Sequence, residues 1–140
     1  MKRLPLLLLL LVLPALAEKK IIYPPEFRPN APFSPGVLVN GTLYVAGQTG
    51  TDLKTNKLPE NFQDEVRTCL DRVGIILKAA GMDYSDAVSV IVYLTDIGMF
   101  QQMNEVYTTY FKANRPARAT VQVAGLVGGA RVEISVTASK

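Results

Sequence analysis

The stretch over residues 87–94, Ala-Val-Ser-Val-Ile-Val-Tyr-Leu, is apolar at nearly every position and rich in β-branched side chains. Such a run predicts a β-strand. Alternation divides it into two apolar faces, with Val88, Val90, Val92 and Leu94 on one and Ala87, Ile91 and Tyr93 on the other. Because both faces are apolar, we expect packed material on both sides of this strand.

Helical periodicity precedes and follows this strand. Apolar residues recur at helical spacing over residues 61–80, and Cys69 lies on that stripe. This position favours a buried, inert thiol over a nucleophile. A second helix is predicted over residues 98–112, with Asp96 as its cap. Its methionine and aromatic stripe is more simply core than a cofactor site.

Four further strands are predicted, over residues 36–39, 42–46, 119–124 and 131–139. Asn40-Gly41 joins the first two, because both residues tolerate the positive φ of a type I′ hairpin turn. We expect the chain to leave the sheet as a loop at Gly47. A glycine-rich loop joins the last two strands, which we interpret as a second hairpin.

The resulting order, β-β-α-β-α-β-β, predicts an α+β fold in which two helices pack on one face of a single mixed sheet. Two helices cannot also cover the other face, where Ile91 and Tyr93 lie. Another subunit of a closed homo-oligomer is the economical cover for that face.

Polar side chains on the last two strands form the candidate site. Arg118, Thr120 and Gln122 alternate along one strand, and Glu133 and Ser135 along the other. We expect all five to project toward the uncovered face. The planar guanidinium of Arg118 suits a bidentate carboxylate contact. On spacing alone, a structural ion pair between Arg118 and Glu133 is favoured.

The N-terminus is typical of a secretory signal peptide. Lys2 and Arg3 precede an apolar run over residues 4–13, and Ala15-Leu16-Ala17 follows as a cleavage site. The run is shorter than the roughly 20 residues of a membrane-spanning helix, so no stable anchor is expected. We therefore divide the chain into a signal peptide (1–17), an extended N-terminal arm (18–31) and a domain (32–140), and expect a periplasmic or secreted protein.

The amino-acid composition excludes several kinds of catalytic and metal site. The chain has no His and one Cys, which leaves no plausible zinc site, no His-dependent triad and no intramolecular disulfide. Removing Lys2 and Arg3 from the 15 basic side chains leaves 13 against 12 acidic ones, a net charge of +1. Such a balance gives no indication of nucleic-acid binding.

Several motifs of the domain resemble the Rid/YjgF family of reactive intermediate deaminases, whose RidA-like members also carry the label endoribonuclease L-PSP. The motifs are AGQTG at 46–50, YLTD at 93–96, MNEVY at 103–107, RPARATVQVA at 115–124 and VEI at 132–134. RPAR is the most specific of them, and the resemblance covers about residues 32–138. It implies a chorismate-mutase-like homotrimer around a central barrel of sheets, with three clefts between subunits.

The resemblance also implies cofactor-free hydrolysis of small carboxylate-bearing 2-imino or 2-enamine acids, such as 2-iminobutanoate and 2-iminopropanoate, to 2-keto acids and ammonia. On this chain Arg118 would hold the substrate carboxylate, and Glu133 would position or activate the attacking water. Asn104 would support the site, and Gly47 would supply main chain to the pocket wall.

Three positions depart from the family's pattern. Phe33 stands where a Tyr is frequent, Ala46 where a Ser is common, and Thr120 where some members have Cys. Phe33 and Thr120 would still line the substrate pocket. The first two changes each remove a hydroxyl from that pocket, which leaves the preferred substrate open.

Three other functions compete with imine hydrolysis. A non-catalytic carboxylate-binding module would use the Arg118 cleft without releasing ammonia, and a stress-linked holdase would not depend on Arg118. An endoribonuclease is the least favoured, because the mature chain is nearly neutral and has no basic stripe.

Cleavage after Ala17 predicts a mature chain of 123 residues that begins at Glu18. Intact-mass spectrometry of exported protein tests this directly. Recovery of the uncleaved 140-residue chain from the cytoplasm would contradict it.

Overall fold

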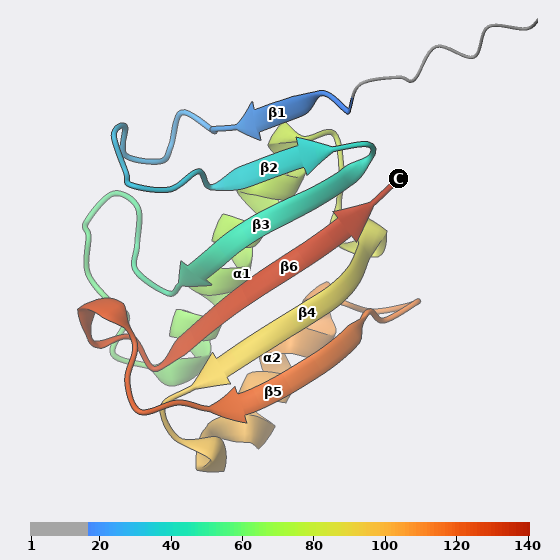
Figure 1. The fold of residues 1–140 in the computed structure, drawn as a ribbon. Coiled ribbons are helices and arrows are strands. Elements are labelled where there is room, and N and C mark those ends of the chain that lie inside the picture. Colours follow the sequence, from blue (N-terminus) through green and yellow to red (C-terminus); the bar gives the residue numbers. More distant parts are fainter. Residues whose placement is uncertain (1–16) are drawn as a thin grey trace, which may run out of the picture.

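A computed structural model describes residues 17–140 of the chain. The predicted signal peptide, apart from Ala17, lies outside the described residues. Within them, one sheet and two α-helices form two layers, with both helices on the same face of the sheet (Figure 1). The strands are β1 (Lys19–Ile22), β2 (Gly36–Val39), β3 (Thr42–Thr49), β4 (Ala87–Leu94), β5 (Ala117–Gln122) and β6 (Val132–Ser139), and the helices are α1 (Phe62–Ala79) and α2 (Phe100–Tyr110). The predicted α+β architecture is confirmed.

The strand order across the sheet is β1-β2-β3-β6-β4-β5. Only β4 and β5 pair in parallel among these neighbours; the other pairs are antiparallel, so the sheet is mixed as predicted. The sheet has one strand more than expected, because β1 forms within the predicted arm and pairs with β2. The arm's prolines begin only at Pro24, so the backbone donors of Lys19–Ile22 are free to join the ladder.

The first hairpin turns at Asn40 and Gly41, with φ of 49° and 75°, as the sequence predicts. The expected loop at Gly47 is wrong. Strand β3 continues to Thr49, with a shift of register against β6 between Val45 and Gln48. This bulge bends the end of β3 and places Gly47 at the irregularity.

Strand β4 has the two apolar faces that were predicted, with one correction at its start. The register shifts between Ala87 and Ser89, so Ala87 is buried with the helix-facing residues and Val88 is 50% exposed. Beyond the bulge the prediction holds, because Val90 is buried and Ile91 is 37% exposed on the other face.

The two final strands are not a hairpin. Strand β4 lies between β5 and β6, and the connecting loop crosses the end of β4. Two backbone hydrogen bonds fix this crossing, from Val123 N to the Leu94 carbonyl at 2.8 Å and from Thr95 N to the Arg131 carbonyl at 3.1 Å. The glycine-rich loop therefore spans one strand rather than making a tight turn.

Both helices bury an apolar stripe against the sheet. Asn61 caps α1 by accepting a hydrogen bond from Asp64 N at 3.1 Å. Cys69 is fully buried and its thiol donates to the Gln48 carbonyl, which confirms the inert thiol; burial raises the pKa of Cys69. Asp96 caps a 3₁₀ turn (Ile97–Met99), so α2 begins two residues later than predicted. Within residues 17–140 no helix has the length and apolar character to span a bilayer.

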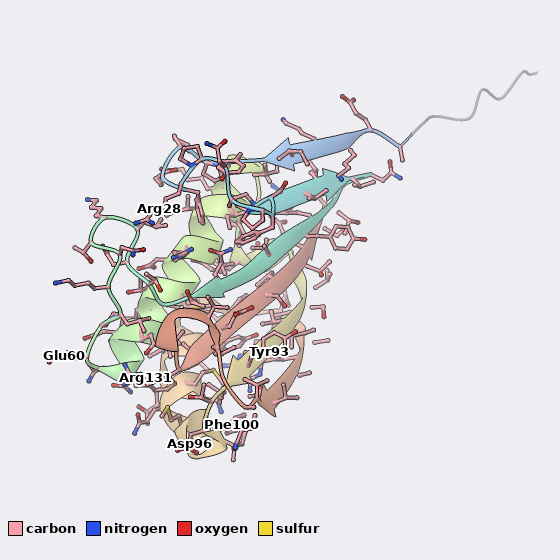
Figure 2. The ribbon with its side chains drawn as sticks, turned by 60° about the vertical axis from the view of Figure 1, so that its left-hand side comes forward. Arg28, Glu60, Tyr93, Asp96, Phe100 and Arg131 are labelled. Carbon is pink, nitrogen blue, oxygen red and sulfur yellow. The ribbon has the colours of Figure 1, made fainter. Side chains whose placement is uncertain are left out.

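A buried ion pair ties α1 to the start of β6. Glu65 is fully buried, and its carboxylate accepts from Arg131 N at 2.7 Å and from Arg131 Nε at 2.6 Å. Arg131 also donates to the carbonyls of Pro59 and Glu60, and Figure 2 shows Arg131 and Glu60 on the same side of the molecule. The pair therefore satisfies the buried charge and fixes the chain on either side of it.

Arg131→Ala should lower the free energy of unfolding by about 3–5 kcal/mol, because it leaves the Glu65 carboxylate buried without its partner. The matched control is Arg67→Ala, which breaks an exposed ion pair with Asp64. That variant should lose less than about 1 kcal/mol. Urea denaturation of both variants measures the difference, and equal losses would contradict this assignment.

Candidate functional site

Arg118 and Thr120 face the helices, not the uncovered side of the sheet. In the β4–β5 ladder Arg118 pairs with Val90 and Thr120 with Val92. Paired residues of neighbouring strands share a face, and both valines are fully buried under the helices. The expected orientation of Arg118, Thr120 and Gln122 is therefore wrong.

Aromatic side chains on α2 and its start explain this orientation. The Arg118 guanidinium carbon lies 4.5 Å from the centroid of the Tyr107 ring and 5.6 Å from that of Phe100. Stacking on ring faces stabilises a cation at a partly covered sheet edge. Ala119 and Val121 then take the other face of β5, where both are exposed. The edge strand thus turns its polar side toward the helices.

Two hydroxyl groups near this guanidinium are buried without a hydrogen-bond partner among the described residues, those of Tyr107 and Thr120. Burial raises the pKa of Tyr107, and the charge of Arg118 opposes that rise. Because buried polar atoms are normally paired, two such hydroxyls beside Arg118 indicate a polar environment whose hydrogen bonds are incomplete within the described chain. We call Arg118, Thr120, Tyr107 and Phe100 the Arg118 half-site.

Asn104 lies one helical turn before Tyr107 on α2 and is half-buried. Residues three apart on a helix are surface neighbours, so Asn104 lies beside the Arg118 half-site.

Glu133 lies on the opposite face. It pairs with Tyr93 on one side and Thr49 on the other, while its neighbours Val132 and Ile134 are buried under the helices. Ser135 shares the face of Glu133, as predicted.

Glu133 lines a cavity of about 380 Å³ together with Phe33 and Gly47. A Cβ atom at residue 47 would collide with Glu133 Oε1, so the bulge of β3 needs glycine for the carboxylate to occupy this position. Phe33 is 59% exposed at the same cavity. We call this cavity the Glu133 pocket.

The favoured Arg118–Glu133 ion pair does not form. The two residues lie on opposite faces of the sheet, on strands separated by β4. Within residues 17–140 neither side chain has an ion-pair partner. The predicted site residues therefore form two groups: Arg118 and Thr120 with Asn104 nearby, and Glu133 with Gly47 and Phe33.

Tyr107 was missed as a site residue because the methionine and aromatic stripe of α2 was interpreted as core, and Phe100 was assigned neither to that stripe nor to the site. The available signal was spacing, since Tyr107 lies one turn beyond Asn104.

Comparison with known proteins identifies the family. A family model described as endoribonuclease L-PSP matches residues 25–140. The chain belongs to the Rid/YjgF family. Its fold matches that of solved structures of the family.

A rat relative named 2-iminobutanoate/2-iminopropanoate deaminase is 46% identical over 107 residues, 76% of this chain and 78% of the relative. The YjgF structure from E. coli matches with a TM-score of 0.81 and 32% identity, covering 86% of this chain and 98% of that one. E. coli TdcF, solved with bound serine, matches with a TM-score of 0.81 and 33% identity over 86% of this chain and 98% of that one.

Proposed function

We propose that this Rid/YjgF chain hydrolyses 2-imino acids and their 2-enamine tautomers to 2-keto acids and ammonia. The reaction takes place in clefts where the Arg118 half-site of one subunit meets the Glu133 pocket of the next. The rat relative named as a deaminase supports this activity. The amino acid bound in TdcF supports a ligand with a carboxylate.

One observation carries the proposal: the Arg118 guanidinium lies over the rings of Tyr107 and Phe100 and has no carboxylate partner in the described chain. A fixed guanidinium fork beside two unpaired hydroxyls suits the carboxylate end of a small acid.

Assembly into a homotrimer completes the site. The uncovered face of the sheet exposes Tyr44 (54%), Ile91 (37%) and Val121 (41%), which another subunit would bury. A closed ring of three copies brings the edge strand of one subunit against the Glu133 pocket of its neighbour.

The chemistry required is modest, because an imine carbon is already electrophilic. Arg118 holds the substrate carboxylate and so fixes C2 for attack. Glu133 accepts a proton from water as the oxygen bonds to C2, and the nitrogen takes up a proton from solvent to give the carbinolamine. Glu133 then returns its proton to the amine nitrogen, the C2–N bond breaks to release ammonia, and the hydroxyl loses its proton to solvent to leave the keto acid.

A non-catalytic carboxylate-binding module is the second candidate. Phe33 and Ala46 favour it, because neither provides a hydroxyl to the pocket. Such a module would bind keto acids saturably and release no ammonia. RNA cleavage has less support because the mature chain is nearly neutral. The N-terminal sequence supports a periplasmic or secreted location for either activity.

Arg118→Ala should lower kcat/KM for a freshly generated 2-imino acid by roughly 30-fold to several-thousand-fold, since truncating one partner of a desolvated charge pair costs about 2–5 kcal/mol. Arg118→Lys should recover only part, because an ammonium lacks the planar fork. Keto-acid release measures the rate, and sedimentation equilibrium of each variant should give three times the chain mass.

An assembled Arg118→Ala trimer with the parent rate would end the deaminase assignment for this site. A stable monomer of the parent chain would refute the inter-subunit cleft.

A further inference from the structure

The Glu133 pocket is lined by more residues than the proposed imine hydrolysis uses. Besides Glu133, Gly47 and Phe33, its lining includes Arg28 from the segment after β1 and Arg72 from α1. A cavity of about 380 Å³ has room for more than a short apolar side chain. The lining of the cavity therefore includes two cations.

Arg72 is held rigidly by neutral groups. Its Nε donates to Gln48 Oε1 at 3.0 Å, and its Nη1 donates to the Thr51 carbonyl at 2.7 Å. The guanidinium carbon lies 5.4 Å from the centroid of the Phe27 ring. Burial lowers the pKa of Arg72, and in residues 17–140 no carboxylate lies within ion-pair distance to offset that burial. These two hydrogen bonds fix the orientation of the guanidinium, and its other N–H groups remain available to a ligand.

Arg28 lines the same cavity as Arg72. Tyr23 donates a hydrogen bond from its hydroxyl to the Arg28 carbonyl, which fixes the backbone at this point. The Arg28 side chain is exposed where the N-terminal segment approaches the loop after β3 (Figure 2). Like Arg72, it has no ion-pair partner within the described part of the chain.

Neither of the two carboxylates that line the cavity forms an ion pair with Arg28 or Arg72. The Asp52 carboxylate accepts from Lys54 N at 3.0 Å and Thr55 N at 2.7 Å, so the turn of its own loop already uses it. Glu133 forms no ion pair with either arginine. A ligand that enters the pocket therefore meets two unneutralised guanidinium groups.

We infer that Arg28 and Arg72 bind a second anionic group of the substrate, so that the site prefers 2-imino dicarboxylic acids. One carboxylate lies on Arg118 of the neighbouring subunit, and the carboxylate of the side chain reaches Arg28 and Arg72. This inference rests on the proposed function, because the inter-subunit cleft is what aligns the two ends.

Calorimetry with the mature protein tests the subsite without catalysis. The probes are 2-oxoglutarate and 2-oxopentanoate, which have the same chain length but differ by the second carboxylate. We expect 2-oxoglutarate to bind at least about tenfold more tightly, because charge-assisted hydrogen bonds hold its second carboxylate. Arg28→Gln and Arg72→Gln should each reduce this preference severalfold.

Arg67→Gln on α1 is the matched control and should keep the preference, because Arg67 lies outside the pocket lining. Arg72→Lys keeps a cation at this position and should retain part of the preference. If Arg72→Gln unfolds, the test of the subsite relies on Arg28→Gln. The Arg28 side chain makes no hydrogen bond within the described chain, so its replacement should leave the fold intact. Equal affinity for the two probes, or variants that weaken both equally, would overturn the subsite.

A kinetic comparison separates this inference from the proposed function. Imines generated from glutamate and from 2-aminopentanoate are hydrolysed, and kcat/KM should favour the glutamate-derived imine by a similar factor. Preferential binding of 2-oxoglutarate without turnover of any imine would refute hydrolysis and leave the anion subsite standing. Turnover of both imines with no preference in rate or binding would refute the subsite and leave hydrolysis standing.

Discussion

Both helices pack on one face of the sheet, and this one-sided cover determines the rest of the structure. The covered face takes the apolar halves of β3, β4 and β6, so the core is complete within one chain. The opposite face keeps Tyr44, Ile91 and Val121 exposed together with Glu133. Exposed apolar surfaces of this kind commonly mark subunit interfaces, and the proposed homotrimer would bury this one.

The same constraint divides the candidate site. Arg118 occupies the helix side of an edge strand, where Tyr107 and Phe100 support its charge, and Glu133 occupies the far side of the sheet beside Gly47. Neither group is neutralised within residues 17–140. Packing within one chain fixes each half locally, and in the proposed trimer the two halves would meet between subunits. Substrate binding would then depend on assembly, and the proposed anion subsite beyond Glu133 would select the substrate side chain.

The sequence correctly predicted the features that depend on neighbouring residues. These are both helical stripes, the Asn40-Gly41 hairpin and the two apolar faces of β4. Alternation also showed which residues of β5 share a face. It could not show which face, because that depends on the rings of α2, far away in the sequence. The order β6-β4-β5 was missed for a similar reason, since a crossing loop and a tight hairpin have the same glycine-rich composition. The predicted site residues were therefore grouped incorrectly, although the resemblance had named them.

The central claim is that Arg118 and Glu133 act across a subunit boundary, and mixed trimers test it most directly. Arg118→Ala and Glu133→Gln chains are co-expressed and their heterotrimers purified, with separately purified homotrimers mixed as the control. Each heterotrimer should regain one of its three clefts, because only one junction in a mixed ring pairs the intact Arg118 of one chain with the intact Glu133 of the next. Imine hydrolysis in the heterotrimers should then rise well above that of either variant alone. Activity no greater than that of the mixed homotrimers would contradict the shared site.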